Sequence, residues 1–359
     1  MARTRSMTRN QNHDDVASSS SRKRRARNGG VAPWSDLDHN LLFLVMMQLG
    51  LIDFLAFGGV CKSWRSLALN NKKIFMASRP PMSMRISNRP YKKDCYLEDF
   101  EGRRFKTILP HAAGRICFGI SCGYLILFRR KTKNKDFWLV NPITRHELHF
   151  PCFRFNVGSD PTIIRCILVF SPSVSRWVFL VLRSFANQVW FSIEGTQEWN
   201  GVSSTFPMID LHAFKGKIYT IHMGCRVYEM RLNPYPKLTL LQTMNFPKPV
   251  FVCPEFLSSS ENLYVTDCRF KDSYDVYQLD FEEMKWVSSG KTLEECAFFI
   301  NGFKYSAAFR SEVWVDHWLL YERCACFFAT VDTGRNYRLL ISGIWYFPND
   351  CLNKNRLDE

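Results

Sequence analysis

Residues 34–68, WSDLDHNLLFLVMMQLGLIDFLAFGGVCKSWRSLA, decide how the first part of this 359-residue chain folds. The apolar run within them, residues 41–60, is long enough to cross a bilayer. However, Gln48 and Asp53 lie inside the run, and an aspartate near a bilayer centre costs about 2.5 to 3.5 kcal/mol on insertion scales. Three glycines also interrupt the run. The sequence therefore favours soluble helices, and no membrane partner is expected.

Three short helices account better for these residues. Asp36 or Asp38 can cap the start of the first helix, and Gly50 ends it. Asp53 can cap a second helix. A third helix is predicted from apolar residues at helical spacing, at Val60, Cys61, Trp64 and Ala68. The apolar face of the first helix consists of Leu41, Leu42, Val45, Met46 and Leu49.

A helical unit this small buries little apolar surface of its own. Phe43 and Met47 put further bulky apolar groups on faces that an isolated helix keeps polar. Such a surplus is typical of a surface that binds a partner. The alternative is a first helical layer that packs on the domain behind it.

Over its whole length this stretch resembles the F-box of plant F-box proteins, typically WxxLPxDLLxxIxxxLxxxDxLxxxxVCKxWRxxA. The ending VCKSWRSLA carries the strongest match. The resemblance implies that the apolar positions dock on a Skp1-like adaptor, and through it on a cullin-RING ligase. These positions are Leu37, Leu41, Leu42, Val45, Met46, Leu49, Leu55, Val60, Cys61 and Trp64.

Two departures from the F-box pattern bear on docking. Asp38 stands where the family has a proline, and Gly58 with Gly59 replaces a more helical pair. A glycine inside a helix costs about 0.5 to 1 kcal/mol relative to alanine. If that helix must be ordered, the glycine pair is expected to weaken adaptor binding tenfold or more.

From about residue 80 onwards, short aromatic or alternating runs bounded by Gly, Pro, Asn and Asp predict strands. Comparable openings near Gly123, Arg176, Gly216 and Asn262 are 53, 40 and 46 residues apart. Propeller blades recur at about 40 to 50 residues. The pattern predicts a β-propeller, called kelch-like because the kelch glycine doublets are missing, and it leaves the blade number open.

This part also resembles the plant domain of unknown function 295, which follows an F-box in a large family. The matching stretches are GYLILF, WLVNPITRHELHFP, FKGKIYTI, VYQLDFEEMKWVSSGKTLEECAFFING and GIWYFP. The predicted fold class is α+β, mainly β, with a three-helix F-box before a propeller. The expected domains are a disordered tail at 1–32, the F-box at 33–74, the β domain at 75–348 and a C-terminal tail at 349–359.

Net charge is +15, so a nucleic-acid partner has to be considered. Residues 1–30 hold eight basic and two acidic side chains, which leaves +9 for the rest. Further cations cluster at residues 129–135 and at Arg103, Arg104 and Lys106, and exposed aromatic residues between them would complete a nucleic-acid or acidic-partner site. A nuclear-import signal is predicted at Arg22, Lys23, Arg24, Arg25 and Arg27.

No catalytic constellation is expected. Residues 119–123 spell GxSxG around Ser121, but the nucleophile elbow of hydrolases must open a helix, and YLILF predicts a strand. His146 and His149 are predicted on an extended edge segment and not at zincin spacing on a helix. The thirteen cysteines form no CxxC pair and are expected to be reduced and mostly buried. Neither a metal nor a cofactor is predicted.

The sequence thus predicts a substrate-recognition subunit of an SCF-type ubiquitin ligase, in the nucleus, the cytoplasm or both, and not an enzyme. The β domain would bind an unknown target protein. The alternative is a nuclear protein that binds nucleic acid or an acidic partner and has a non-functional F-box. Aromatic candidates for the target face, each also explained by core packing, are Trp190, Trp199, Tyr219, Trp286 and Trp314.

Overall fold

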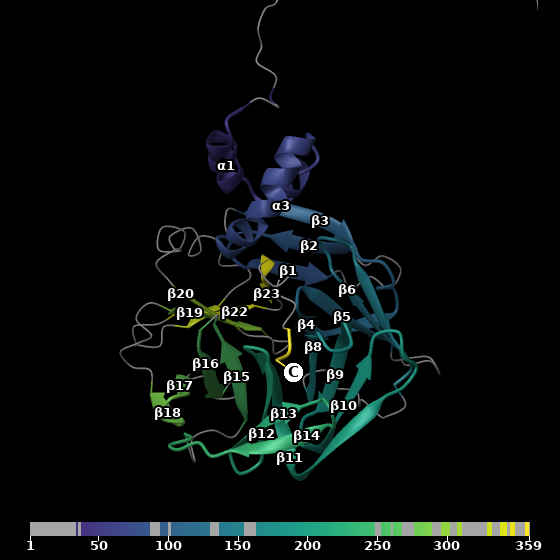
Figure 1. The fold of residues 1–359 in the computed structure, drawn as a ribbon, viewed down its shortest axis with the longest axis vertical. Helices are drawn as coiled ribbons and strands as arrows, with labels where there is room; N and C mark the ends of the chain where they lie inside the picture. Colours follow the sequence, from purple (N-terminus) through teal and green to yellow (C-terminus); the bar gives the residue numbers. More distant parts are fainter. Residues whose placement is uncertain are drawn as a thin grey trace, which may run out of the picture.

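The computed structural model places three helices at one edge of a ring of mostly antiparallel sheets (Figure 1). The predicted import signal and Trp314 lie outside the described residues. None of the helices in the described part of the chain combines the length and the apolarity that a membrane crossing requires. The described residues are 34, 37–86, 94–99, 102–129, 136–153, 163–247, 253–259, 261–267, 276–288, 296–301, 307–310, 329–331, 338–342, 345–348 and 356–358.

The helices follow the predicted order with two corrections. The Asp38 carboxylate caps the first helix by accepting the N–H of Asn40 at 2.8 Å. Gly50 starts the second helix without a side-chain cap, so the predicted cap at Asp53 is wrong, and this residue lies in the first turn. Val60 and Cys61 were predicted to lie in the third helix, but they precede it. The bounds are α1 (His39–Gln48), α2 (Leu51–Phe57) and α3 (Lys62–Ala77).

The described strands form four sheets, and the prediction of a mainly β fold is confirmed. The first sheet holds β1 (Met82–Ile86), β2 (Asp94–Glu98), β3 (Arg104–Ile108) and β23 (Trp345–Tyr346). The second sheet holds β4 (Arg115–Ser121), β5 (Tyr124–Arg129), β6 (Phe137–Val140) and β7 (Glu147–Phe150).

The third sheet holds β8 (Ile164–Ser171), β9 (Arg176–Arg183), β10 (Ala186–Ile193), β11 (Asn200–Phe214), β12 (Lys217–His222), β13 (Arg226–Arg231) and β14 (Lys237–Leu241). The fourth holds β15 (Pro254–Ser258), β16 (Leu263–Asp267), β17 (Val276–Asp280), β18 (Lys285–Ser288), β19 (Cys296–Asn301), β20 (Ala307–Arg310), β21 (Ala329–Val331) and β22 (Arg338–Ser342).

The four predicted repeat openings fall at equivalent places in the fold. Gly123, Arg176, Gly216 and Asn262 each lie where a hairpin turns, between β4 and β5, β8 and β9, β11 and β12, and β15 and β16. Gly123 and Gly216 have φ of 73° and 74°, which a residue with a Cβ rarely adopts. The sequence repeat therefore marks one recurring hairpin. The 15-residue strand β11 joins two such units into the seven-stranded sheet, with a register shift between Met208 and Asp210.

The ring closes through segments from opposite ends of the sequence. Strand β23 pairs with β1, with Tyr346 opposite Met82 and Trp345 opposite Ser83. Trp345 and Tyr346 are both fully buried. This pairing gives β1 a hydrogen-bonded neighbour on the side away from β2, so the first sheet contains a strand from a distant part of the sequence.

The helices and the propeller share one apolar core. Leu42, Met46 and Phe75 of the helices belong to the same buried cluster as Met84 and Tyr346 of the first sheet. The guanidinium of Arg79 donates to the carbonyl of Met47 and lies 4.4 Å from the ring centre of Phe75. The helical unit is therefore anchored to the β domain by packing and not only by its chain connection.

A buried ion network joins the third sheet to the fourth. Arg165 on β8 donates to Asp210 on β11 at 2.7 Å and to Glu255 on β15 at 2.8 Å. The second carboxylate oxygen of Asp210 accepts the N–H of Phe256 at 2.7 Å. Burial and the neighbouring Glu255 charge raise the pKa of Asp210 above its usual value, against the effect of Arg165.

Two buried histidines predict acid sensitivity. Burial lowers the pKa of His212 and the pKa of His222 to about 4. The ring of His212 is hydrogen-bonded to the hydroxyl of Ser258 at 2.9 Å. The unfolded chain takes up these protons near pH 6.5, so stability is complete above that pH and falls as pH drops towards 4. In His212→Gln, the loss of unfolding free energy between pH 6.5 and 4.5 is expected to be about 2 kcal/mol smaller than in the parent.

Urea unfolding at pH 7.0, 5.5 and 4.5 measures this difference. Leu240→Ser, at an exposed residue that does not titrate, is the control and should leave the acid dependence between pH 6.5 and 4.5 as it is in the parent. Equal pH dependence in His212→Gln and the parent would contradict the assignment.

Candidate partner-docking surface

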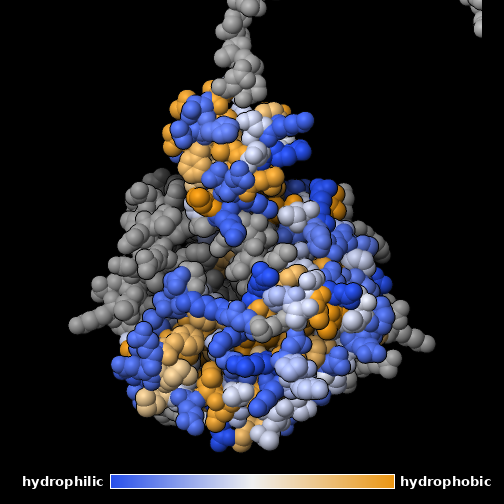
Figure 2. All heavy atoms as spheres, in the orientation of Figure 1, coloured by the Kyte–Doolittle hydropathy of each residue, from blue (hydrophilic) through white to orange (hydrophobic). Residues whose placement is uncertain are grey.

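Helix α1 is apolar on two opposite faces. Leu42 and Met46 are fully buried against the shared core. Leu41, Leu44 and Val45 point outward and are 53%, 60% and 47% exposed. A helix with two apolar faces has one more than its own fold uses, which is typical of a partner surface. Figure 2 shows apolar residues gathered at the surface of the helical part.

The next two elements also expose apolar residues. Leu55 of α2 is 41% exposed, and Val60, in the turn before α3, is 56% exposed. We call Leu41, Leu44, Val45, Leu55 and Val60 the outer apolar face. It includes four of the ten residues that the F-box resemblance assigns to adaptor docking.

The other six assigned residues contribute to packing in this structure. Leu42 and Met46 are buried, and Leu37, Leu49, Cys61 and Trp64 are half-buried. Trp64 stacks on Phe57 with ring centres 4.4 Å apart and donates its indole N–H to the carbonyl of Trp34 at 3.1 Å. These residues therefore shape the helical unit, while the outer apolar face is what solvent reaches.

Sequence reasoning missed Leu44 and misplaced two other residues. Phe43 and Met47 were expected to form the surplus surface, but both are half-buried and pack against the shared core. The propeller behind the helix accounts for them. Leu44 lies at i+3 from Leu41 on the same side, a spacing that could have identified it.

The departures from the F-box pattern fit the fold without the expected cost. Asp38 caps α1 where the family has proline. Gly58 and Gly59 lie after the last residue of α2, in the turn, so the penalty for glycine inside a helix does not apply. The guanidinium of Arg65 donates to the carbonyl of Gly58 at 3.1 Å and holds this turn.

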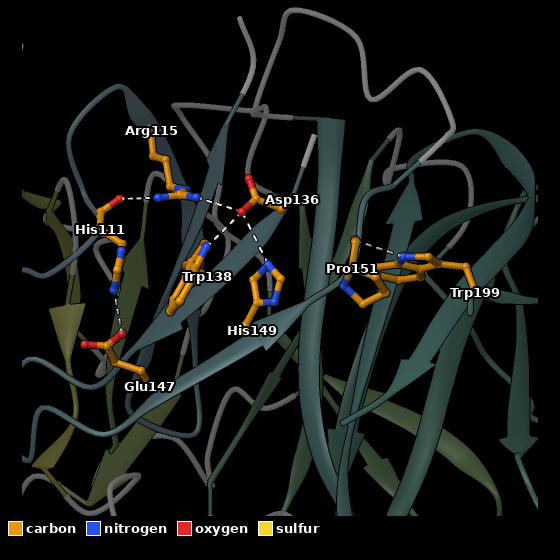
Figure 3. A network of polar contacts seen from close by, with 8 residues as sticks. All are labelled: His111, Arg115, Asp136, Trp138, Glu147, His149, Pro151 and Trp199. Atoms are coloured by element: carbon orange, nitrogen blue, oxygen red, sulfur yellow. Dashed lines mark hydrogen bonds and ion pairs between the residues drawn. The ribbon is translucent and has the colours of Figure 1, made fainter. Parts of the chain in front are cut away.

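A cluster of polar and aromatic groups occupies the edge of the second sheet (Figure 3). Arg115, which is buried, donates to Asp136 at 2.8 Å and to the carbonyl of His111 at 2.6 Å. The same Asp136 oxygen accepts the indole N–H of Trp138 at 2.8 Å and lies 3.3 Å from Nε2 of His149. The Trp138 indole therefore shares one carboxylate oxygen of Asp136 with Arg115 and His149.

Two histidine rings lie against the Trp138 indole. His111 stacks on it with ring centres 3.9 Å apart, and His149 is tilted against it at 4.7 Å. Nε2 of His111 also lies 3.2 Å from the carboxylate of Glu147 (Figure 3). Burial alone would raise the pKa of Asp136, but Arg115 and the Trp138 N–H hold it below its usual value.

Asp136→Asn is expected to lower the free energy of unfolding by about 1–2 kcal/mol at pH 7. The bonds to Arg115 and Trp138 lose their charge assistance, and the cost stays modest because the amide oxygen of asparagine can still accept them. The lowered pKa means that this contribution is complete above about pH 4 and disappears as pH falls further. Denaturant unfolding at pH 7 and pH 3 tests both statements, with Glu282→Gln, an exposed residue of the turn between β17 and β18, as the control.

The basic cluster of the first sheet is neutralised by its neighbours. Arg104 and Lys106 on β3 pair with Glu98 and Asp94 on β2 at 3.1 and 3.0 Å, and Arg103 pairs with Asp99 at 2.7 Å. In the second cluster, residues 130–135 lie outside the described residues. Arg103, Arg104 and Lys106 therefore each lie beside a carboxylate, and the nucleic-acid alternative stays a prediction.

The aromatic candidates for target binding serve the core. Tyr219 and Trp286 are 3% and 2% exposed, and Trp190 packs partly buried beside the second sheet. Trp199 packs edge-on against Phe153 at 4.7 Å and donates to the carbonyl of Pro151 at 3.2 Å (Figure 3). Core packing, the alternative given for each residue, is what the structure shows for these four.

The motifs that invite a catalytic interpretation have structural roles. Ser121 is buried at the end of β4, and its hydroxyl accepts the N–H of Leu168 at 2.9 Å. A strand follows it, as predicted. Nδ1 of His146 bonds to the hydroxyl of Tyr124 at 2.8 Å, away from the Asp136 contact of His149. Among the described residues, no three His, Cys, Asp or Glu side chains gather closely enough to hold a metal ion.

Comparison with known families divides the chain in two. Residues 34–76 match the F-box domain, and residues 95–314 match the KIB1-4 beta-propeller. No curated protein matches the sequence. An F-box joined to a β-propeller is the domain combination of substrate-recognition adaptors of SCF ligases, which are typically not enzymes.

Solved structures resemble the chain only distantly. TolB from Acinetobacter baumannii has a TM-score of 0.37 and 13% identity over 56% of this chain and 50% of its own, so the chain spans half the length of TolB. Virginiamycin B lyase from Staphylococcus aureus has a TM-score of 0.31 and 9% identity over 58% of this chain and 83% of its own. By the family match over residues 95–314, the chain belongs to the KIB1-4 beta-propeller family, with an F-box before the propeller.

Proposed function

We propose that this chain recruits a target protein to an SCF-type ubiquitin ligase, with its outer apolar face bound to a Skp1-like adaptor. The observation that carries the proposal is the exposure of Leu41, Leu44 and Val45 on a helix whose opposite face is buried. A surface of this kind gains free energy by burial against a partner, at about 25 cal/mol for each Å² of apolar area. The F-box match supports an adaptor of the Skp1 type as that partner.

The β domain then serves as a rigid arm that holds the target. Its core is continuous with that of the helices, through Phe75, Met84 and Tyr346 among others, so adaptor and target keep a fixed separation. Ubiquitin transfer takes place on other subunits. The role of this chain is positioning, which raises the effective concentration of the target at the ligase.

Two finer features belong to the same proposal. The stretches that resemble the plant domain of unknown function 295 include strands β5, β6 and β12, which supports a plant origin for this combination. The basic residues Arg22, Lys23, Arg24, Arg25 and Arg27 direct the protein to the nucleus, so that it acts on its target there as well as in the cytoplasm.

The direct test mixes the purified full chain with a purified Skp1-like adaptor and measures complex formation by size-exclusion chromatography and calorimetry. A stable one-to-one complex is expected at micromolar concentration or below. Addition of the cullin-RING components should give a single larger assembly. A well-folded chain that forms no complex with any Skp1-like adaptor of its own organism refutes the proposal.

A further inference from the structure

Residues 356–358 lie against the inner strands of the propeller. Arg356 pairs in parallel with Phe170 at the end of β8, and the N–H of Leu357 donates to the carbonyl of Phe170 at 2.9 Å. The N–H of Asp358 donates to the carbonyl of Gly216, in the turn between β11 and β12, at 2.8 Å. Figure 1 shows this end of the chain inside the ring of sheets.

One side chain of this segment is buried, and its exposed neighbour Asp358 lies against the Gly216 turn. Leu357 is 8% exposed and joins the apolar cluster that includes Ile167 and Met208. The Asp358 carboxylate lies over Gly216, where a Cβ would come within 2.4 Å of it. Gly216 therefore has two roles: its positive φ allows the turn between β11 and β12, and its missing side chain leaves room for the carboxylate of Asp358.

The backbone contacts are those of a peptide added to a strand. Strand β8 is the end strand of its seven-stranded sheet, with β9 on its other side. An extended segment can add to the edge of such a strand through main-chain hydrogen bonds, while one pocket for a side chain gives specificity. Leu357 and Asp358 both make main-chain hydrogen bonds, and the side chain of Leu357 is buried in the apolar cluster.

We propose that the edge of β8 at Phe170, with the Gly216 turn, is a binding site for an extended peptide that carries leucine followed by an acidic residue. The segment 356–358 fills this site in the isolated chain, and a target protein binds by displacing it. In the described part of the chain, one buried leucine and two backbone hydrogen bonds hold residues 356–358. A longer target segment with the same groups would make more contacts with the site than these residues do. This inference rests on the proposed function, because it names the chemistry of the target.

Fluorescence anisotropy of a labelled KNRLDE peptide, the sequence of residues 354–359, tests the site on the full chain. In Leu357→Ser the internal segment loses its anchor, and the peptide is expected to bind at least tenfold more tightly than to the parent chain. The same peptide with serine in place of leucine should not bind. Leu240→Ser, an exposed leucine on the outer strand β14, is the matched control and should behave as the parent does.

A second measurement covers the case in which Leu357→Ser does not fold. In the parent chain, an excess of the unlabelled peptide should increase hydrogen exchange at the amides of Leu357 and Asp358, since their acceptors are taken over. A folded variant that binds no peptide, or amides that stay protected at millimolar peptide, would show that 356–358 is a permanent part of the core. Adaptor capture by the same samples separates this failure from a failure of the proposed function.

Discussion

Leu44→Asp is expected to weaken binding of a Skp1-like adaptor at least about a hundredfold without changing the thermal unfolding of the chain. A leucine buried in an interface contributes about 1.5–3 kcal/mol, and an aspartate there adds the cost of desolvating a charge. Together these exceed the 2.8 kcal/mol that corresponds to a factor of about a hundred. Because Leu44 is 60% exposed in the free chain, folding loses little.

Two matched variants separate docking from folding. Leu42→Asp changes the adjacent leucine, which is fully buried in the core shared with the propeller, and should unfold the helices and destabilise the β domain with them. Leu240→Asp places the same charge on exposed strand β14 and should leave adaptor binding intact. Calorimetric titration with the adaptor and thermal unfolding measure both properties. If folded Leu44→Asp still bound the adaptor tightly, the outer apolar face would not be the docking site.

Arg165→Met is expected to destabilise the propeller by about 3–5 kcal/mol at pH 7, a large part of the stability of a typical domain. The change leaves the buried carboxylates of Asp210 and Glu255 beside each other without their shared cation. Burial and the Glu255 charge already raise the pKa of Asp210 while Arg165 is present. Without the guanidinium, protonation becomes the way to relieve the repulsion.

Chemical denaturation at pH 7.5 and pH 5.5 tests this expectation. The difference between Arg165→Met and the parent should shrink at the lower pH, because a protonated carboxyl no longer repels its neighbour. Arg176→Met, on the next strand and exposed, is the control and should cost little. A penalty that is small, or independent of pH, would mean that the network contributes little to holding β8, β11 and β15 together.

Local pattern was enough to predict the helices and the recurring hairpin. Apolar residues at helical spacing around Leu42 and Met46 predicted α1, and the openings at Gly123 and Gly216 marked equivalent turns. Both signals act within a few residues, where backbone preference and alternation decide the structure. The fold class followed from them.

Which face of α1 stays open could not be predicted in the same way. Leu41 and Leu42 are chemically the same residue one position apart, and only the propeller packed behind the helix distinguishes them. The network of Arg165, Asp210 and Glu255 joins residues 45 and 90 positions apart in the sequence. No local pattern connects them, because β8, β11 and β15 meet only when the β domain has folded.

The pairing of β23 with β1 also affects how the core under the helices is completed. Tyr346 belongs to the same buried cluster as Leu42 and Phe75 of the helices, although these residues lie far from it in the sequence. Met82 and Met84 of β1 belong to this cluster as well, so the strand next to the helices supplies part of it. The inner face of the helices is therefore fully covered only when β23 has paired with β1.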